Sequence, residues 1–162
     1  MSQKQHPDST YSAADYERML SILGVELGDE EQYEKKSLND VTAGQVAQLL
    51  SSGLMKNYKR HNHSPTGLYF LDFMTRMPVT RARHAPYRLE GYAVPPIRHD
   101  CRVSITGIRA VKELDQPEQG RFAGWFLPGG DDEWKGPVEP DHKPLAGPNE
   151  WTAGPKPRAW WD

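Results

Sequence analysis

Two histidines separated by one residue are the part of this chain that most resembles a metal site. On an extended strand, His61 and His63 would project their imidazoles to the same side, as coordination of a metal requires. A catalytic zinc needs three converging protein ligands, and the surrounding segment 59–67 is cationic and rich in turn-forming residues. His84, His99 or His142 could supply further ligands, but the spacing matches no zinc pattern. His61 and His63 are therefore weak metal candidates, and we expect neither metal nor cofactor.

A neighbouring histidine and aspartate could serve acid/base chemistry, with the carboxylate orienting the imidazole. Adjacent residues of a strand point to opposite faces, so His99 and Asp100 could meet only in a turn. Cys101 begins an apolar strand face, which is typical of an inert buried thiol. Serine-nucleophile motifs, phosphate-cradling glycine loops and dinucleotide fingerprints are all absent from the sequence. No residue can be assigned a catalytic role from these patterns.

The charges of the chain are unevenly distributed, although its net charge is only −2 over 162 residues. Residues 1–55 carry a net charge of −5, residues 56–109 carry +7, and residues 110–162 carry −4. Such a block of like charge often marks an interaction surface. The basic middle segment is therefore the most informative global feature of the sequence.

Cations in the basic segment 56–109 are interleaved with tyrosine and phenylalanine rings, a combination typical of phosphate contact and base stacking. The positive charge could equally be neutralised by the acidic ends of the chain folding back on this segment, or by an acidic protein surface. The sequence pI of about 6.3 counts against a dedicated nucleic-acid protein. The candidate contacts to an anion or nucleic acid are Lys59, Arg60, Arg76, Arg81, Arg83 and Arg88.

Helix signals are concentrated in the first third of the chain. Ser12 followed by Asp15 predicts a helix start, an apolar stripe follows it, and Gly24 is a plausible stop. Thr42 and Gln45 fit a capping box and predict a helix over 42–52. A short exposed helix is expected over 29–36, where acidic residues precede lysines.

Strand signals follow residue 66. The aromatic and aliphatic composition of 68–74, 87–94, 101–111 and 121–127 predicts four strands, with a turn at 116–119. The apolar positions of 101–111 slip by one residue beyond Gly107, which predicts a β-bulge because glycine tolerates positive φ. The fold class is therefore α+β, with short N-terminal helices packed on a small antiparallel sheet or partial barrel.

The last segment, 128–162, differs from the rest, with 7 prolines and 5 glycines among its 35 residues. This proline density disfavours long regular elements, yet aromatic residues are depleted in disordered chains. We therefore expect an extended Pro/Gly/Trp-rich tail that lies on its own domain or on a neighbour. The domain organisation is then a flexible arm over 1–10, one α+β domain over 11–127, and the tail. The candidate anchors for a protein partner are Trp134, Trp151, Trp160 and Trp161.

Membrane and secreted classes have no support in the sequence. The longest apolar runs have four residues, far short of a membrane span, and residues 1–7 lack the apolar core of a secretory signal. One cysteine excludes an internal disulfide and a Cys-rich zinc site. We expect a location in the cytoplasm, in an intracellular assembly or in a virion.

Three functional hypotheses follow. The first is a non-catalytic structural or interaction subunit of a larger assembly, docking on a protein partner through its Trp/Pro-rich tail and basic central sheet. The second is a nucleic-acid-binding module that uses the basic aromatic segment 56–109. The third is a small enzyme that depends on His and Asp side chains.

Overall fold

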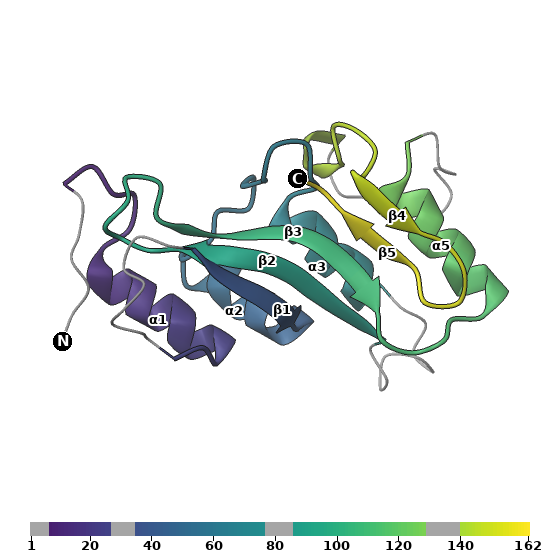
Figure 1. Ribbon diagram of the computed structural model, residues 1–162, viewed down its shortest axis with the longest axis horizontal. Coiled ribbons are helices and arrows are strands. Elements are labelled where there is room, and N and C mark those ends of the chain that lie inside the picture. The colour runs from purple at the N-terminus through teal and green to yellow at the C-terminus, as the bar shows by residue number, and fades with distance from the viewer. Residues whose placement is uncertain (1–6, 27–34, 77–85, 129–139) are drawn as a thin grey trace.

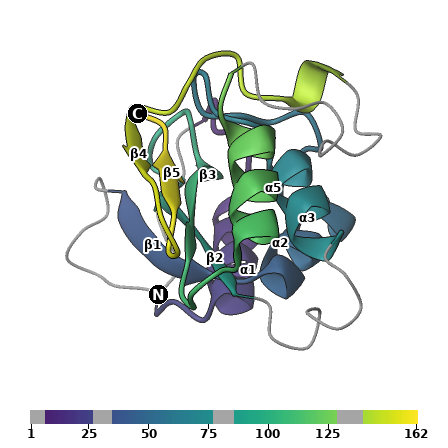
Figure 2. The same ribbon diagram turned by 90° about the vertical axis from the view of Figure 1, so that its right-hand side faces the viewer.

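The computed structural model describes residues 7–26, 35–76, 86–128 and 140–162 (Figure 1). The helices of these residues lie on one side of a five-stranded antiparallel sheet with strand order β1-β2-β3-β5-β4 (Figure 2). The α+β class expected from the sequence is confirmed. In chain order the elements are α1 (Ala13–Leu23), β1 (Lys36–Val41), α2 (Ala43–Ser51), α3 (Gly67–Thr75), β2 (Tyr87–Val94), β3 (Arg102–Ala110), α5 (Gln116–Phe126), the 3-10 turn η2 (Pro140–His142), β4 (Glu150–Thr152) and β5 (Arg158–Trp160).

The first two helices begin as their sequences predict. Ser12 Oγ accepts a hydrogen bond from the Asp15 amide at 3.0 Å, and the Asp15 carboxylate accepts one from the Ser12 amide at 3.1 Å. Thr42 and Gln45 form the same reciprocal pair at the start of α2. Gly24 ends α1 in the left-handed conformation, with φ of 69°. Both predicted capping boxes are confirmed.

Strands β2 and β3 pair along their whole lengths and form the centre of the sheet. Glu90 pairs with Gly107 and Gly91 pairs with Ile105, so Thr106 is an extra residue, and the predicted β-bulge is confirmed. The bulge was expected because glycine tolerates positive φ, and this reason is wrong, since Gly107 is not among the described glycines with positive φ. A Cβ at Gly107 would instead lie 2.8 Å from the Ala159 carbonyl oxygen, so glycine lets β5 approach.

Two predicted strands are helices in the structure. Segment 68–74 lies within α3, which begins at Thr66, where the side chain accepts a hydrogen bond from the Tyr69 amide. Segment 121–127 lies largely within α5, which Asp115 caps by accepting from the Glu118 amide. The predicted turn at 116–119 is the first turn of α5, because Pro117 is tolerated there without loss of a helical hydrogen bond. In α3 apolar residues also occupy partly exposed positions such as Leu68 and Leu71, and in α5 the apolar residues are confined to the last turns, so the helical period is not evident in either sequence.

The region expected to form an exposed helix is only partly described. Residues 29–34 lie outside the described residues, and Lys36 begins strand β1, so the helix does not extend to its predicted end. β1 pairs with β2, placing Lys36 opposite Ala93 and Val41 opposite Leu89.

The described part of the C-terminal segment adds two strands to the sheet. β5 pairs with β3, with Gly107 opposite Trp160, and β4 lies outside β5 at the edge. Trp161 is fully buried, and its ring lies 6.0 Å from that of Phe70 and 6.1 Å from that of Phe126. The described residues of this segment therefore pack on their own domain.

No helix among the described residues combines the length and the apolar character needed to cross a membrane. The apolar helix α3 has only nine residues and is packed inside the protein. Its Tyr69 ring stacks on Trp125 of α5 at a centroid distance of 4.9 Å. The apolar residues of the chain are therefore used to join helices and sheet in one core.

Candidate anion-binding site

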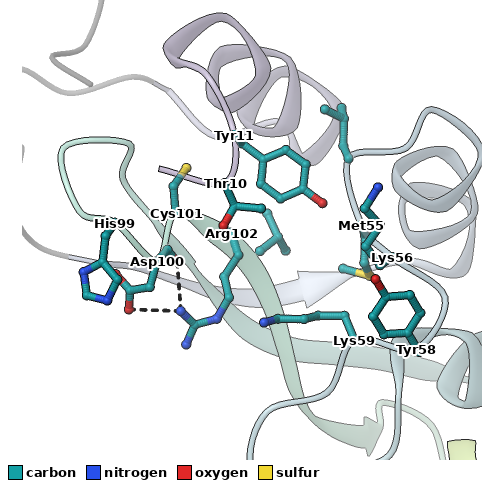
Figure 3. A pocket seen from close by; sticks show the side chains of 12 residues that line it. Thr10, Tyr11, Met55, Lys56, Tyr58, Lys59, His99, Asp100, Cys101 and Arg102 are labelled. Atoms are coloured by element: carbon teal, nitrogen blue, oxygen red, sulfur yellow. Dashed lines mark hydrogen bonds and ion pairs between the residues drawn. The ribbon is translucent and has the colours of Figure 1, made fainter. Parts of the chain in front are cut away.

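Three segments far apart in the sequence enclose a cavity of about 350 Å³ (Figure 3). They are residues 10–11 before α1, residues 54–59 after α2, and residues 99–103, which lead into β3. The charged side chains in this lining are Lys56, Lys59 and Arg102, with Asp100 as the single carboxylate among the described residues. We call this the cationic cavity.

Arg102 is held in place by hydrogen bonds from each of its three guanidinium nitrogens. Nη1 donates to the carbonyl oxygen of Asp100 at 2.9 Å and to its carboxylate at 3.0 Å. Nε donates to Ser104 Oγ at 2.8 Å, and Nη2 donates to the Tyr92 hydroxyl at 3.3 Å. A guanidinium fixed in this way loses little side-chain entropy when it binds an anion, which favours affinity.

The carboxylate of Asp100 is shared between two arginines. Arg98 donates to both of its oxygens, at 3.0 and 2.9 Å, while Arg102 donates to one. Burial opposes ionisation of Asp100, but the hydrogen bonds from Arg102 and Arg98 outweigh it and lower the pKa of the carboxyl. One negative charge is thus shared by two guanidinium groups, so the lining of the cavity keeps a net positive charge.

Lys59 faces Arg102 across the cavity, and Figure 3 shows its ammonium pointing toward the guanidinium. Partial burial and the positive charge of Arg102 lower the pKa of Lys59, while Asp100 acts in the opposite direction. No carboxylate in the described part of the chain forms an ion pair with Lys59. Two cations that repel one another across a cavity are an arrangement that a bound anion stabilises.

Aromatic rings border the same cavity. Tyr58 stands next to Lys59 in the sequence and is 72 % exposed, although it is a large ring. Tyr11 forms part of the opposite wall and is half-buried, and burial raises the pKa of its hydroxyl. Tyr58 therefore presents ring surface to solvent beside the cations.

A second cavity of about 230 Å³ lies beyond Tyr92, with Lys35, Glu90 and Trp160 in its lining. The Tyr92 hydroxyl lies 2.5 Å from Nδ1 of His61, which lines this second cavity as well. Burial lowers the pKa of His61, and the charges of Arg102 and Lys35 lower it further. A neutral imidazole can accept the hydrogen of Tyr92, so a hydrogen-bonded chain joins the two cavities.

Of the six cations expected to contact an anion, the structure describes four, and Lys59 alone of these four lines the cationic cavity. Arg60 donates to the carbonyl oxygens of Ser64 and Lys143 and so has a structural role. Arg76 pairs with Asp72, and Arg88 donates to the Tyr87 carbonyl oxygen. Arg81 and Arg83 lie outside the described residues.

Several other arginines of the basic segment and of the tail form ion pairs with carboxylates. Arg109 pairs with Asp40 of the acidic N-terminal segment. Arg158 donates to both carboxylate oxygens of Glu90, at 2.8 and 2.9 Å, and pairs with Glu150. Compensation within the chain therefore neutralises part of the basic segment, whereas Lys59 is left without a carboxylate partner among the described residues.

The tryptophans expected to anchor a partner are found in different environments. Trp161 is fully buried in the core of its own chain, and its Nε1 donates to the Ala146 carbonyl oxygen at 3.0 Å. Trp151 and Trp160 are half-buried, with the Trp151 ring 5.5 Å from that of Phe122. Trp134 lies outside the described residues. In this conformation Trp161 has no surface left for a partner.

The histidine candidates are not brought together. His61 lines the second cavity, His63 is exposed, and His99 lines the cationic cavity. No group of three potential ligands among the described residues could hold a metal ion. Asp100, the expected partner of His99 in acid/base chemistry, lines the same cavity as His99 and accepts from two guanidinium groups.

The central role of Arg102 is not evident from the sequence, where it is one of ten cations in the basic segment. A local signal is present, because Asp100 lies two residues from both Arg98 and Arg102. The approach of Lys59 to Arg102 has no local signal, since it depends on how the segment after α2 meets β3.

Comparisons of the chain with protein-family models, with curated proteins and with solved structures found no match. The fold and the site thus define an α+β protein with a cationic cavity beside the start of its central strand. A functional assignment must rest on the chemistry of that cavity.

Proposed function

We propose that this protein is a non-catalytic interaction module that docks a phosphate-bearing partner in its cationic cavity. The observation that carries the proposal is the approach of Lys59 to Arg102 across a cavity whose one carboxylate already serves two arginines. Phosphate oxygens accept charge-assisted hydrogen bonds from guanidinium and ammonium groups and would remove the repulsion between them.

This proposal places the docking site in the cavity and not in the tail. The buried Trp161 and the β3–β5 pairing use the tail within its own domain, which weakens the support for docking through it. The arginines of the central sheet also have carboxylate partners in part, as Arg109 and Arg158 show. A role as a subunit of a larger assembly remains compatible with docking through the cavity.

An enzyme that depends on His and Asp side chains has less support. His61 and His99 line different cavities, and although His99 and Asp100 line the same one, the carboxylate of Asp100 accepts hydrogen bonds from Arg98 and Arg102. General acid/base catalysis needs such groups within hydrogen-bond reach of a common substrate atom.

The direct test is a titration of the protein with inorganic phosphate and pyrophosphate, in which binding is measured by calorimetry and by changes in amide chemical shifts. We expect the largest shifts in residues 56–59 and 99–103, and an affinity that falls as salt is raised. Lys59→Gln and Arg102→Gln should each weaken binding by about tenfold or more, since a charge-assisted hydrogen bond contributes roughly 1.5–3 kcal/mol.

Lys156→Gln is the matched control, because Lys156 is an exposed lysine that lines neither cavity. It removes the same charge and should leave binding within about twofold of the unmodified protein. An absence of binding, or equal weakening by Lys156→Gln and Lys59→Gln, would overturn the proposal.

A further inference from the structure

We infer that the phosphate-bearing ligand of the cationic cavity is single-stranded nucleic acid, with a base stacked on Tyr58 and a phosphate between Lys59 and Arg102. This inference rests on the function proposed above and specifies its ligand. It joins three observations: an exposed ring beside two converging cations, a second polar cavity next to the first, and the concave shape of the cationic cavity.

Tyr58 is the first observation. Most aromatic side chains among the described residues are packed in the core, and nine of the twelve largest fully buried side chains are Trp, Tyr or Phe. Tyr58 is 72 % exposed, and it stands between Lys56 and Lys59, which line the same cavity. A ring beside cations accepts a nucleobase by stacking, while the cations contact the adjoining phosphate.

The second observation concerns the length of the ligand. Tyr92 accepts a hydrogen bond from Arg102 of the cationic cavity and itself lines the second cavity. There the ammonium of Lys35 lies 4.3 Å from the Tyr92 ring centroid, and Trp160 contributes a half-buried ring. Because Glu90 and Asp162 also line the second cavity, it would take a base and not a phosphate, and a strand of two or more nucleotides could contact both cavities.

The third observation favours a single strand over a duplex. The cationic cavity is a concave site of about 350 Å³ bordered by Tyr58, so a ligand must place a phosphate inside it and a ring against the tyrosine. Bases of a duplex are stacked on one another and paired, and exposing one costs free energy. Unpaired bases of a single strand are free to stack on an aromatic side chain.

The test uses fluorescence anisotropy with a labelled single strand of about ten nucleotides, and inorganic polyphosphate as an anion without bases. Tyr58→Leu should weaken binding of the strand by about fivefold or more and leave polyphosphate affinity unchanged. Tyr58→Trp should restore binding of the strand, because the larger ring also stacks. Lys59→Gln should weaken both ligands.

Leu145→Ala is the control for loss of an exposed apolar side chain, because Leu145 is 64 % exposed and lines neither cavity. It should leave both affinities unchanged. Circular dichroism of each variant verifies that the fold is retained.

The outcomes separate the two proposals. If polyphosphate binds with the expected dependence on Lys59 but Tyr58→Leu leaves binding of the strand unchanged, the nucleic-acid assignment is wrong and the anion site stands. Tighter binding of a duplex or of a phosphopeptide than of the single strand also overturns the assignment. If neither polyphosphate nor the strand binds, both proposals fall.

Discussion

The hydroxyl of Tyr92 lies 2.5 Å from Nδ1 of His61, and the two rings meet edge to face at a centroid distance of 5.2 Å. The same hydroxyl accepts a hydrogen bond from Arg102, so its own hydrogen is available for His61. When Tyr92 donates this hydrogen, Nδ1 of His61 accepts it and carries no proton, and the lowered pKa of His61 favours the neutral imidazole that this needs. The positive charge of Arg102 in the cationic cavity therefore affects the pKa of His61.

The first prediction is that His61 titrates below the usual histidine pKa of about 6.5. Burial, Arg102 and Lys35 all lower its pKa, in that order of importance. NMR titration of the imidazole resonances measures this value directly. Arg102→Gln should raise the pKa of His61, whereas Lys156→Gln should not change it. A value above 6.5 in the unmodified protein would contradict this prediction.

A second prediction concerns stability against pH. Because the pKa of His61 is lower in the folded protein, the unfolded chain binds a proton first as the pH falls. The contribution of His61 to stability is thus fully present above about pH 6.5 and is lost as the pH decreases toward the folded pKa. Urea unfolding at pH 7.5 and 5.5 should show a smaller loss for His61→Gln than for the unmodified protein. An equal loss in both would contradict this prediction.

A third prediction compares two glycine substitutions. A Cβ at Gly91 would overlap the backbone carbonyl oxygen of Ser104, so Gly91→Ala must displace β2 from β3. We expect it to lower the free energy of unfolding by at least about 2 kcal/mol. A Cβ at Gly120 of α5 meets nothing within 4 Å, so Gly120→Ala should raise stability by about 1 kcal/mol. Chemical denaturation measures both, and a neutral Gly91→Ala would exclude the close approach.

A fourth prediction tests whether the tail is part of the folded unit. Trp161→Ala removes a fully buried ring and its hydrogen bond to Ala146, and should cost about 3–5 kcal/mol. Trp160→Ala removes a half-buried ring of the same size and should cost clearly less. Urea unfolding followed by circular dichroism distinguishes them. Equal and small losses would indicate that the tail does not pack on its own domain in solution.

A fifth prediction concerns the single cysteine. Burial raises the pKa of Cys101 to about 11, and its side chain is 1 % exposed although it adjoins the cationic cavity. At pH 8 only about one thiol in a thousand is then ionised, and thiolate is the reactive form. Alkylation by iodoacetamide, followed by mass spectrometry, should be far slower in the folded protein than in urea. Comparable rates would show that the thiol is accessible.

Elements with complete local signals could be predicted from the sequence. The capping boxes at Ser12 and Thr42 located α1 and α2, and alternation with a one-residue slip located β3 and its bulge. α3 could not be recognised from periodicity because its sequence is almost continuously apolar, and α5 could not because its apolar residues are confined to its last turns, where they resemble a short strand. The start of α5 does have a sequence signal, because Asp115 followed by Pro117 and Glu118 is typical of a helix start.

The candidate site could be predicted in composition but not in arrangement. The basic segment contains Lys56, Tyr58, Lys59 and Arg102, and the first three share one short loop. Their approach to Arg102 depends on packing between segments more than forty residues apart, for which one sequence has no signal. The same holds for Trp161, whose burial depends on the pairing of β5 with β3.

The pairing of β5 with β3 also bears on how the chain folds during synthesis. A nascent chain that has not reached residue 158 lacks β5, and β3 then has β2 as its one strand neighbour. The backbone of β3 at Gly107 and Arg109 would be open to pairing with other chains on the polysome, a known route to aggregation. Folding of this protein is thus expected to complete only after release of residues 158–161 from the ribosome, and to benefit from chaperones until then.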